Sequence, residues 1–339
     1  MIFLSLIAVL AIVYFTDIPA MVQRDGWFIG LINRLRALPA ISSAPLLAMI
    51  LALAIPLALL VLLMLLVIYQ GFYLYLFFIY VPVLLYSLGR GNFVADVNTY
   101  LAIASRGDSV AAAKLVDELA GRVAIEHDSR ETSSWQSLHT QALKVFSYRG
   151  FEKTFAVLFW FVIAGPLGAL LYRLSVIYRE QTIANSAEAQ LAEKWLWLIE
   201  LPAVRLMGLT WAFVGNFDSC PWRDSLLDTE SSSITILNNS LRGALSAPTD
   251  AYRVATAEVV DAELAVATVA EPAAESLEAA LPDTRSEEAQ EAIEDLVGIT
   301  LSPQVEPAYS FALVKSSVPL YSRSLLFCVG VIAFATLFI

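Results

Sequence analysis

A run of 45 residues at positions 44–88 contains no charged side chain. One helix of that length would extend about 68 Å, whereas the apolar core of a bilayer is about 30 Å thick. Gln70 is the strongly polar residue within the run, and Tyr69, Phe72 and Tyr73 surround it. Aromatic rings of this kind gather where a membrane meets water. The pattern therefore predicts a transmembrane hairpin over 44–88 that turns at Gln70.

Other apolar segments predict further membrane helices. They are an N-terminal membrane helix at 1–16, broken transmembrane segments at 154–217 and a C-terminal transmembrane anchor at 319–339. Residues 154–172 are long enough to cross a bilayer. The segment 195–217 contains Glu200 and Arg205, so it either crosses the membrane or lies partly in the interface.

The predicted span at 154–172 is interrupted near its centre by Gly165, Pro166 and Gly168. Proline removes a backbone donor and glycine weakens a helix, so we expect a helix break at this point. Two interpretations stay open. The break is either a kink where helices pack closely, or part of a broken helix that lines a binding site, as in transporters.

Lysine and arginine in the connecting segments predict the orientation. The loop at 17–43 and the polar region at 89–153 lie on the same side of the predicted hairpin, and they contain three and eight lysine or arginine residues. We therefore expect both to be cytoplasmic, and we expect 89–153 to form a small helical module. Asp108 precedes an alanine-rich segment there and is a typical helix N-cap.

The segment 218–318 is acidic and rich in alanine and glutamate. It has 18 acidic and 5 basic residues, a net charge of −13, whereas the rest of the chain has 14 acidic and 16 basic residues, a net charge of +2. Such a composition buries little apolar surface, so we expect a long, partly disordered insertion. The predicted fold class is all-α: a polytopic helical membrane protein with a small cytoplasmic helical module and this insertion.

Composition narrows the classes of function. Hydrophobic residues make up 58% of the chain and charged residues 16%, against about 45–50% and about 25% in soluble domains. An ordinary soluble enzyme is thereby excluded, and the net charge of −11 argues against a nucleic-acid partner. The cysteines and histidines lack metal-ligand spacing, and the sequence has no phosphate-binding loop or nucleophile elbow. We expect neither a metal nor a cofactor.

The remaining candidates for chemistry are charged residues beside the predicted spans. Several of them would share the cytoplasmic membrane face, where arginines could bind an anionic ligand through paired hydrogen bonds. The alternative is contact with lipid phosphates. The candidate residues of this anion site are Arg24, Arg90, Arg106, Asp108, Arg149, Arg173 and Arg205.

Three stretches of the chain, taken in order with the hairpin, resemble the AmpE family. They are residues 100–109, residues 158–161 followed by Gly165 and Pro166, and residues 202–208. We expect the resemblance to cover most of 1–217 and the last span.

The resemblance implies a multi-pass protein of the inner (cytoplasmic) membrane of a Gram-negative bacterium. It implies a regulatory or signalling role linked to β-lactamase induction and cell-wall recycling, without catalysis. The expected partners are the lipid bilayer, an anionic small molecule or cell-wall fragment, and a membrane or cytoplasmic protein.

Shorter pieces are also similar to the CobD/CbiB type of cobalamin-pathway membrane enzymes, which attach aminopropanol through an amide bond. The shared pieces are residues 158–160, 168–173 and 202–206. The polar run that precedes the corresponding span in those enzymes is replaced here by residues 148–154. Two alternatives to a signalling protein therefore stay open: an amide-forming enzyme at the cytoplasmic face, and an accessory subunit of a membrane complex.

Overall fold

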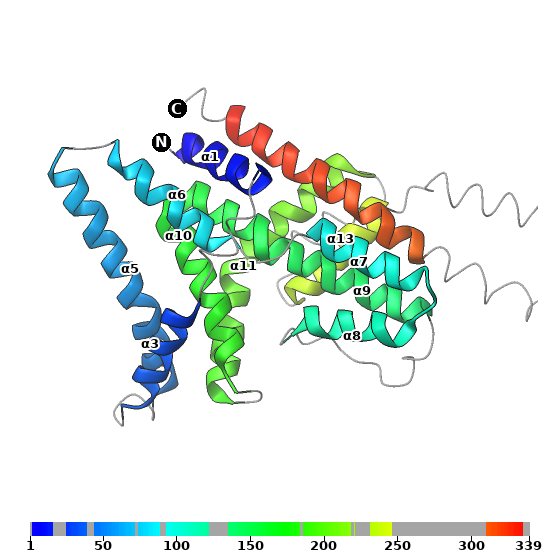
Figure 1. Ribbon diagram of the computed structural model, residues 1–339, viewed down its shortest axis with the longest axis horizontal. Coiled ribbons are helices and arrows are strands. Elements are labelled where there is room, and N and C mark those ends of the chain that lie inside the picture. Colours follow the sequence, from blue (N-terminus) through cyan, green and yellow to red (C-terminus); the bar gives the residue numbers. More distant parts are fainter. Residues whose placement is uncertain are drawn as a thin grey trace, which may run out of the picture.

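A computed structural model describes residues 2–15, 25–38, 44–71, 74–88, 93–121, 135–183, 186–217, 220, 231–245 and 310–334. Every regular element in these ranges is a helix, and they contain no strand. The predicted all-α membrane fold is therefore confirmed. Figure 1 shows the helices in sequence order and the position of each in the molecule.

Helix α5 (Pro45–Tyr69) forms the first arm of the predicted hairpin. Pro45 opens the helix, a position where the missing N–H costs nothing. Its 25 residues extend about 38 Å, enough to cross a bilayer. The chain turns at Gln70 and Gly71, as predicted, and Gly71 has a positive φ of 73°.

The second arm of the hairpin is shorter than predicted. Helix α6 (Tyr75–Ser87) has 13 residues and extends about 20 Å, less than the thickness of a bilayer core. Helix α6 packs against α10 (Ala156–Gln181) and α1 (Ile2–Phe15). Helix α1 has 14 residues and corresponds to the predicted N-terminal membrane helix, and it too is short for a complete crossing.

The two sides of α5 differ in what they contact. One side exposes leucines, with 66% of Leu59, 57% of Leu62 and 57% of Leu65 accessible. The other side packs against Phe28 and Ile32 of α3 (Gly26–Arg36) in an apolar cluster that also includes side chains of α10. An apolar surface this extensive on one side of a helix indicates contact with lipid.

The longest helical segment combines three elements without a loop between them. They are α9 (Trp135–Gly150), the π-helical turn η1 (Phe151–Phe155) and α10 (Ala156–Gln181). The predicted boundary between the cytoplasmic module and a membrane span, at 153/154, falls inside this continuous helix. Arg149 and Glu152, just before that position, bond each other along the helix.

Gly165 breaks α10, as predicted. Its φ of 64° and ψ of −152° form a conformation that residues with a Cβ rarely adopt. Pro166 follows the break, and Gly168 lies so close to the preceding turn that an added Cβ would be 2.4 Å from the carbonyl oxygen of Trp160. This close approach favours the interpretation as a kink where backbone segments pack tightly.

Helix α11 (Ala187–Val214) covers the fourth apolar segment and begins earlier than the predicted 195. Ser186 caps its start, since the Ser186 hydroxyl accepts a hydrogen bond from the backbone N–H of Ala189 at 3.1 Å. Pro202 lies inside the helix, which nevertheless remains continuous. Its 28 residues are long and apolar enough to cross a membrane.

Helix α13 (Ser233–Leu245) corrects the predicted limits of the acidic insertion. These residues fall inside the predicted insertion at 218–318. The helix instead packs along α11 and α9, and it buries Leu237 and Leu241 in the main core. Its apolar residues recur at helical spacing, which the acidic composition of the surrounding segment concealed. The folded body therefore includes residues 233–245, whereas 246–309 lie outside the described residues.

The C-terminal anchor begins at Ser310 rather than at 319 and continues to Phe334. Together with α5, α11 and the segment Ser137–Gln181, it makes four helices among the described residues that are long and apolar enough to cross a membrane. The hydroxyl of Tyr321 fixes this helix to the body, because it donates to the carbonyl oxygen of Gly150 at 2.6 Å.

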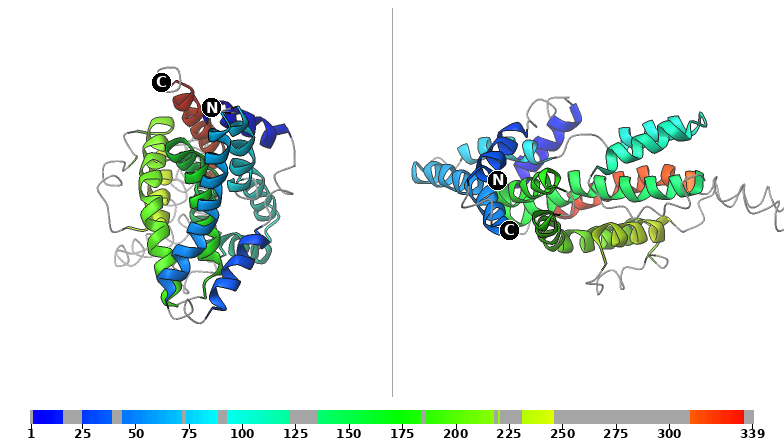
Figure 2. Two further views of the ribbon diagram at one scale, coloured as in Figure 1. Left: turned by 90° about the vertical axis from the view of Figure 1, so that its left-hand side faces the viewer. Right: turned by 90° about the horizontal axis from the view of Figure 1, so that it is seen from below.

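A small helical module lies at the end of the molecule opposite α5, as Figures 1 and 2 both show. It contains α7 (Phe93–Ala104) and α8 (Ser109–Ala120), which pack against α9. Asp108 caps α8 as predicted, since its carboxylate accepts from the backbone N–H of Ala111 at 2.9 Å.

Candidate functional site

A cluster of charged and phenolic side chains lies where α9, η1, α10 and α11 meet, and its members are buried or nearly so except Glu180, whose side chain is 38% exposed. We call it the buried charge network, and its members are Tyr148, Arg149, Glu152, Tyr172, Arg179, Glu180 and Glu200. Glu152, Arg179 and Glu200 are 4%, 6% and 2% exposed. Charged residues are rarely buried to this degree unless they are paired, so this cluster is the first candidate for a functional site.

Arg179 joins two of the elements through its guanidinium. Its Nη2 donates to Glu152 Oε2 at 3.2 Å, and its Nη1 donates to the hydroxyl of Tyr148 at 2.7 Å. Glu152 lies in the π-helical turn, whereas Arg179 is in the last turns of α10. π-helical turns are rare in proteins, and those that do occur are often found at functional sites. Here the turn carries the carboxylate that Arg179 binds.

Glu200 brings α11 into the same network. Its Oε1 accepts one hydrogen bond from the hydroxyl of Tyr148 at 2.9 Å and another from the hydroxyl of Tyr172 at 3.0 Å. Ser233, at the start of α13, also hydrogen-bonds this carboxyl group. The contacts of Glu200 in the described part of the chain are thus hydroxyl groups, in contrast to the arginine contacts of Glu152.

Arg149 links the network to the helical module. Its Nη1 donates to Glu152 Oε2 at 3.0 Å and to Glu180 Oε1 at 3.1 Å. Its Nε and Nη2 donate to the carbonyl oxygens of Leu119 at 2.7 Å and Ala120 at 2.9 Å. Carbonyl groups in the last turn of a helix lack partners within it, and a cation there also interacts favourably with the helix dipole. Arg149 therefore caps α8.

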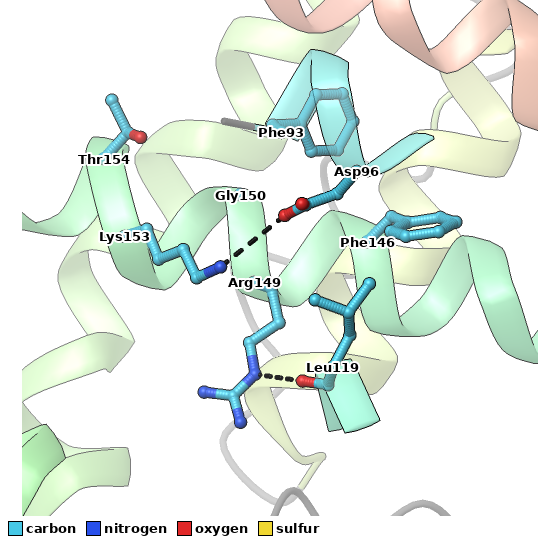
Figure 3. Close-up of a pocket in the computed structure, with 8 residues that line it drawn as sticks. All are labelled: Phe93, Asp96, Leu119, Phe146, Arg149, Gly150, Lys153 and Thr154. Carbon is cyan, nitrogen blue, oxygen red and sulfur yellow. Dashed lines mark hydrogen bonds and ion pairs between the residues drawn. The ribbon is translucent and has the colours of Figure 1, made fainter. Parts of the chain in front are cut away.

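A crevice adjoins the network on the side of α7. Figure 3 shows its lining, with Lys153 directed toward Asp96 and Arg149 toward the carbonyl of Leu119. The Nζ of Lys153 lies 3.6 Å from Asp96 Oδ2, an ion pair with both side chains partly exposed. This pair is the more accessible neighbour of the buried arginine pairs, and it joins α7 to the π-helical turn.

The chemistry of the network is that of paired charges in an apolar surrounding. Removing one partner of such a pair leaves an unbalanced buried charge and costs about 3–5 kcal/mol. The network therefore fixes the relative positions of α9, α10 and α11.

Among the described residues, no group of three or more His, Cys, Asp or Glu side chains is arranged to hold a metal ion.

The structure distributes the predicted anion-site residues over several places. Arg149 belongs to the buried charge network, whereas Arg173 pairs with Asp25 at 3.1 Å, at the start of α3. Arg106 is exposed in the turn between α7 and α8, beside the capping residue Asp108. Arg205 is half-buried on α11. Arg24 and Arg90 lie outside the described residues.

Sequence reasoning missed the residues that complete the network. Arg179, Tyr148, Tyr172 and Glu180 were not among the candidates, and Glu200 was noted as a charge in an apolar segment without a role. A signal was present, because Tyr172 and Arg179 are seven residues apart and therefore share a helix face. Tyr148 and Glu152 have the equivalent spacing of four residues.

The fold and the network define a helical membrane protein in which charged and tyrosine side chains bond one another across three helices. A comparison with protein-family models identifies the family. The model described as "Regulatory signalling modulator protein AmpE" matches residues 1–270, most of the chain, so this chain belongs to the AmpE family. No curated protein and no solved structure matched the chain.

The matched range differs at its end from the range that the sequence analysis expected. It continues beyond residue 217 to residue 270 and so includes α13, and it stops before the C-terminal helix Ser310–Phe334. All members of the buried charge network lie inside the matched range.

Proposed function

We propose that this chain is a multi-pass inner-membrane protein of a Gram-negative bacterium that modulates β-lactamase induction during cell-wall recycling. The match of residues 1–270 to the family of regulatory signalling modulators carries the proposal. The four membrane-length helices support a location in a membrane.

The geometry of the network supports regulation in preference to turnover. Glu152 accepts hydrogen bonds from Arg149 and Arg179, and Glu200 accepts them from two tyrosines. These groups stabilise one arrangement of helices, and a signalling protein needs such an arrangement that a ligand or partner can alter.

We propose an anionic cell-wall fragment as the signal, with arginines of the cytoplasmic face among its contacts. Arg106 supports this part of the proposal because its side chain is exposed. Lys114 on α8 provides a matched control, since its side chain is 77% exposed and it carries the same charge. Arg106→Ala should weaken the response to inducer, whereas Lys114→Ala should leave it intact.

The experiment for the function is deletion of the gene in its native host, followed by assay of β-lactamase activity after a sub-inhibitory dose of a β-lactam. We expect induction to change several-fold and to return to the parental level when the intact gene is supplied on a plasmid. Identical induction in the deletion strain and its parent would refute the proposed function.

A further inference from the structure

Glu200 differs from Glu152 in the partners that surround its carboxyl group. Glu152 receives hydrogen bonds from both arginines of the network. Glu200, which is 2% exposed, receives hydrogen bonds from the hydroxyls of Tyr148 and Tyr172 on one oxygen. Burial disfavours a carboxylate unless a cation or several donors compensate for the lost water.

Both arginines of the network bond carboxylates other than Glu200. Arg179 bonds Glu152, and Arg149 bonds Glu152 and Glu180, whose side chain is 38% exposed. An ionised Glu200 would place its charge where the hydrogen-bond donors are neutral hydroxyls. A buried charge without a directly bonded cation is costly, so the neutral acid is the favoured form.

The hydrogen bonds around Glu200 also suit the neutral acid. Its Oε1, as the carbonyl oxygen of the acid, can accept from both tyrosines, because a carbonyl oxygen has two lone pairs. Ser233 hydrogen-bonds the same carboxyl group, and because its hydroxyl can serve as either donor or acceptor, it can accept from the O–H of the acid. Gain or loss of the proton therefore requires only that the Ser233 hydroxyl rotate.

We propose that Glu200 is a proton-binding site in the core of this membrane protein and that its carboxyl group is protonated at neutral pH. The groups that face it are Tyr148 of α9, Glu152 of η1, Tyr172 and Arg179 of α10, and Ser233 of α13. Loss of the proton adds one negative charge to the network. Tyr148 connects Glu200 to Arg179, because its hydroxyl also accepts a hydrogen bond from Arg179 Nη1 at 2.7 Å.

The proposal goes beyond the signalling role and does not depend on it. It gives the network a second charge state that differs by one proton. Both states keep the hydrogen bonds of the two tyrosines, so the site can exchange its proton without unfolding the helices around it.

Infrared spectroscopy of the purified full-length protein in detergent tests the proposal, because a protonated carboxyl group has a C=O stretch distinct from that of a carboxylate. At neutral pH we expect the band of one protonated carboxyl group. Glu200→Gln should abolish this band and leave the melting temperature unchanged, since glutamine is neutral and has nearly the same shape. The control Glu193→Gln changes an exposed glutamate of the same helix and should leave the band in place.

Absence of the band from the intact protein at neutral pH would overturn the proposal, and so would its persistence in folded Glu200→Gln. A second variant keeps the test decisive if Glu200→Gln does not fold. Ser233→Ala removes the acceptor of the proton, so the band should shift to higher frequency without loss of intensity. An unshifted band in Ser233→Ala would contradict the assignment to Glu200.

Discussion

The hydroxyl of Tyr148 donates a hydrogen bond to the carboxyl group of Glu200 across 2.9 Å, although the two residues are 52 positions apart in the sequence. The same hydroxyl accepts a hydrogen bond from Arg179 at 2.7 Å. Tyr148 thus joins three helices through one oxygen atom, and it is fully used as both a donor and an acceptor.

Tyr148→Phe should lower the free energy of unfolding by about 2–3 kcal/mol, because it leaves both Arg179 and Glu200 with a missing partner in the core. Tyr172→Phe removes one donor to Glu200, which keeps its contact with Tyr148, so it should cost about 1 kcal/mol. Denaturant titration of the two variants in the same detergent measures the difference. Equal losses would show that the contact between Arg179 and Tyr148 adds nothing.

Arg149 should control the order of the helical module. Arg149→Gln removes the donors to the carbonyls of Leu119 and Ala120, so the amides of α8 should exchange with deuterium at least about 10-fold faster. Hydrogen exchange with mass spectrometry measures this rate. Lys153→Gln is the control, since it removes a partly exposed ion pair at 3.6 Å and should leave α8 unchanged.

Gly168 should not tolerate a larger residue. In Gly168→Ala the added Cβ would lie 2.4 Å from the backbone oxygen of Trp160, which cannot move away as a side chain could. We expect a loss of about 1–3 kcal/mol from this overpacking, measured by thermal unfolding. The control is Gly330→Ala in the C-terminal helix, where an added Cβ meets no atom within 4 Å. A wild-type melting temperature for Gly168→Ala would contradict the tight kink.

Cys220 should resist alkylation in the folded protein. Its side chain is 5% exposed, and burial raises the pKa of the Cys220 thiol to about 11, so little of the reactive thiolate is present near neutral pH. In a Cys328→Ser background, maleimide should react with Cys220 at least about 100-fold more slowly than with a free thiol at pH 8. Unfolding should restore the rate, and raising the pH toward the thiol pKa should increase it. The Cys220 thiol lies 3.5 Å from the carbonyl oxygen of Ser240 in α13, so fast labelling of the native protein would contradict this contact.

The membrane helices were predictable because their signal is local. The uncharged run predicted α5 and its turn at Gln70, and Gly165 and Pro166 predicted the break in α10. These features depend on the composition of neighbouring residues, which the sequence displays directly. The end of α6 at Ser87 matches the end of the uncharged run, but its start at Tyr75, five residues after Gln70, is not marked by hydropathy, because the residues between them are also apolar.

The network was not predictable as a unit, because its contacts cross between helices far apart in the sequence. Arg149 was a candidate from its place beside an apolar segment, yet its partners Glu180 and Leu119 lie about 30 residues away in either direction. Arg173 was expected to share a site with it, and the structure pairs Arg173 with Asp25 instead. Charges near apolar segments indicate that pairing must occur, but only the fold determines the partner.

The most direct test of the account is a double-mutant cycle between Glu152 and Arg179, the pair that joins the π-helical turn to the end of α10 at 3.2 Å. The free energy of unfolding is measured for the intact protein, Glu152→Gln, Arg179→Met and the double variant. We predict a coupling energy of about 2–3 kcal/mol, because Glu152→Gln leaves the buried Arg179 without its carboxylate, Arg179→Met leaves Glu152 with Arg149 as its bonded cation, and the double change removes both charges of the pair. A coupling energy below about 0.5 kcal/mol would contradict the claim that this buried charge network holds the helices together.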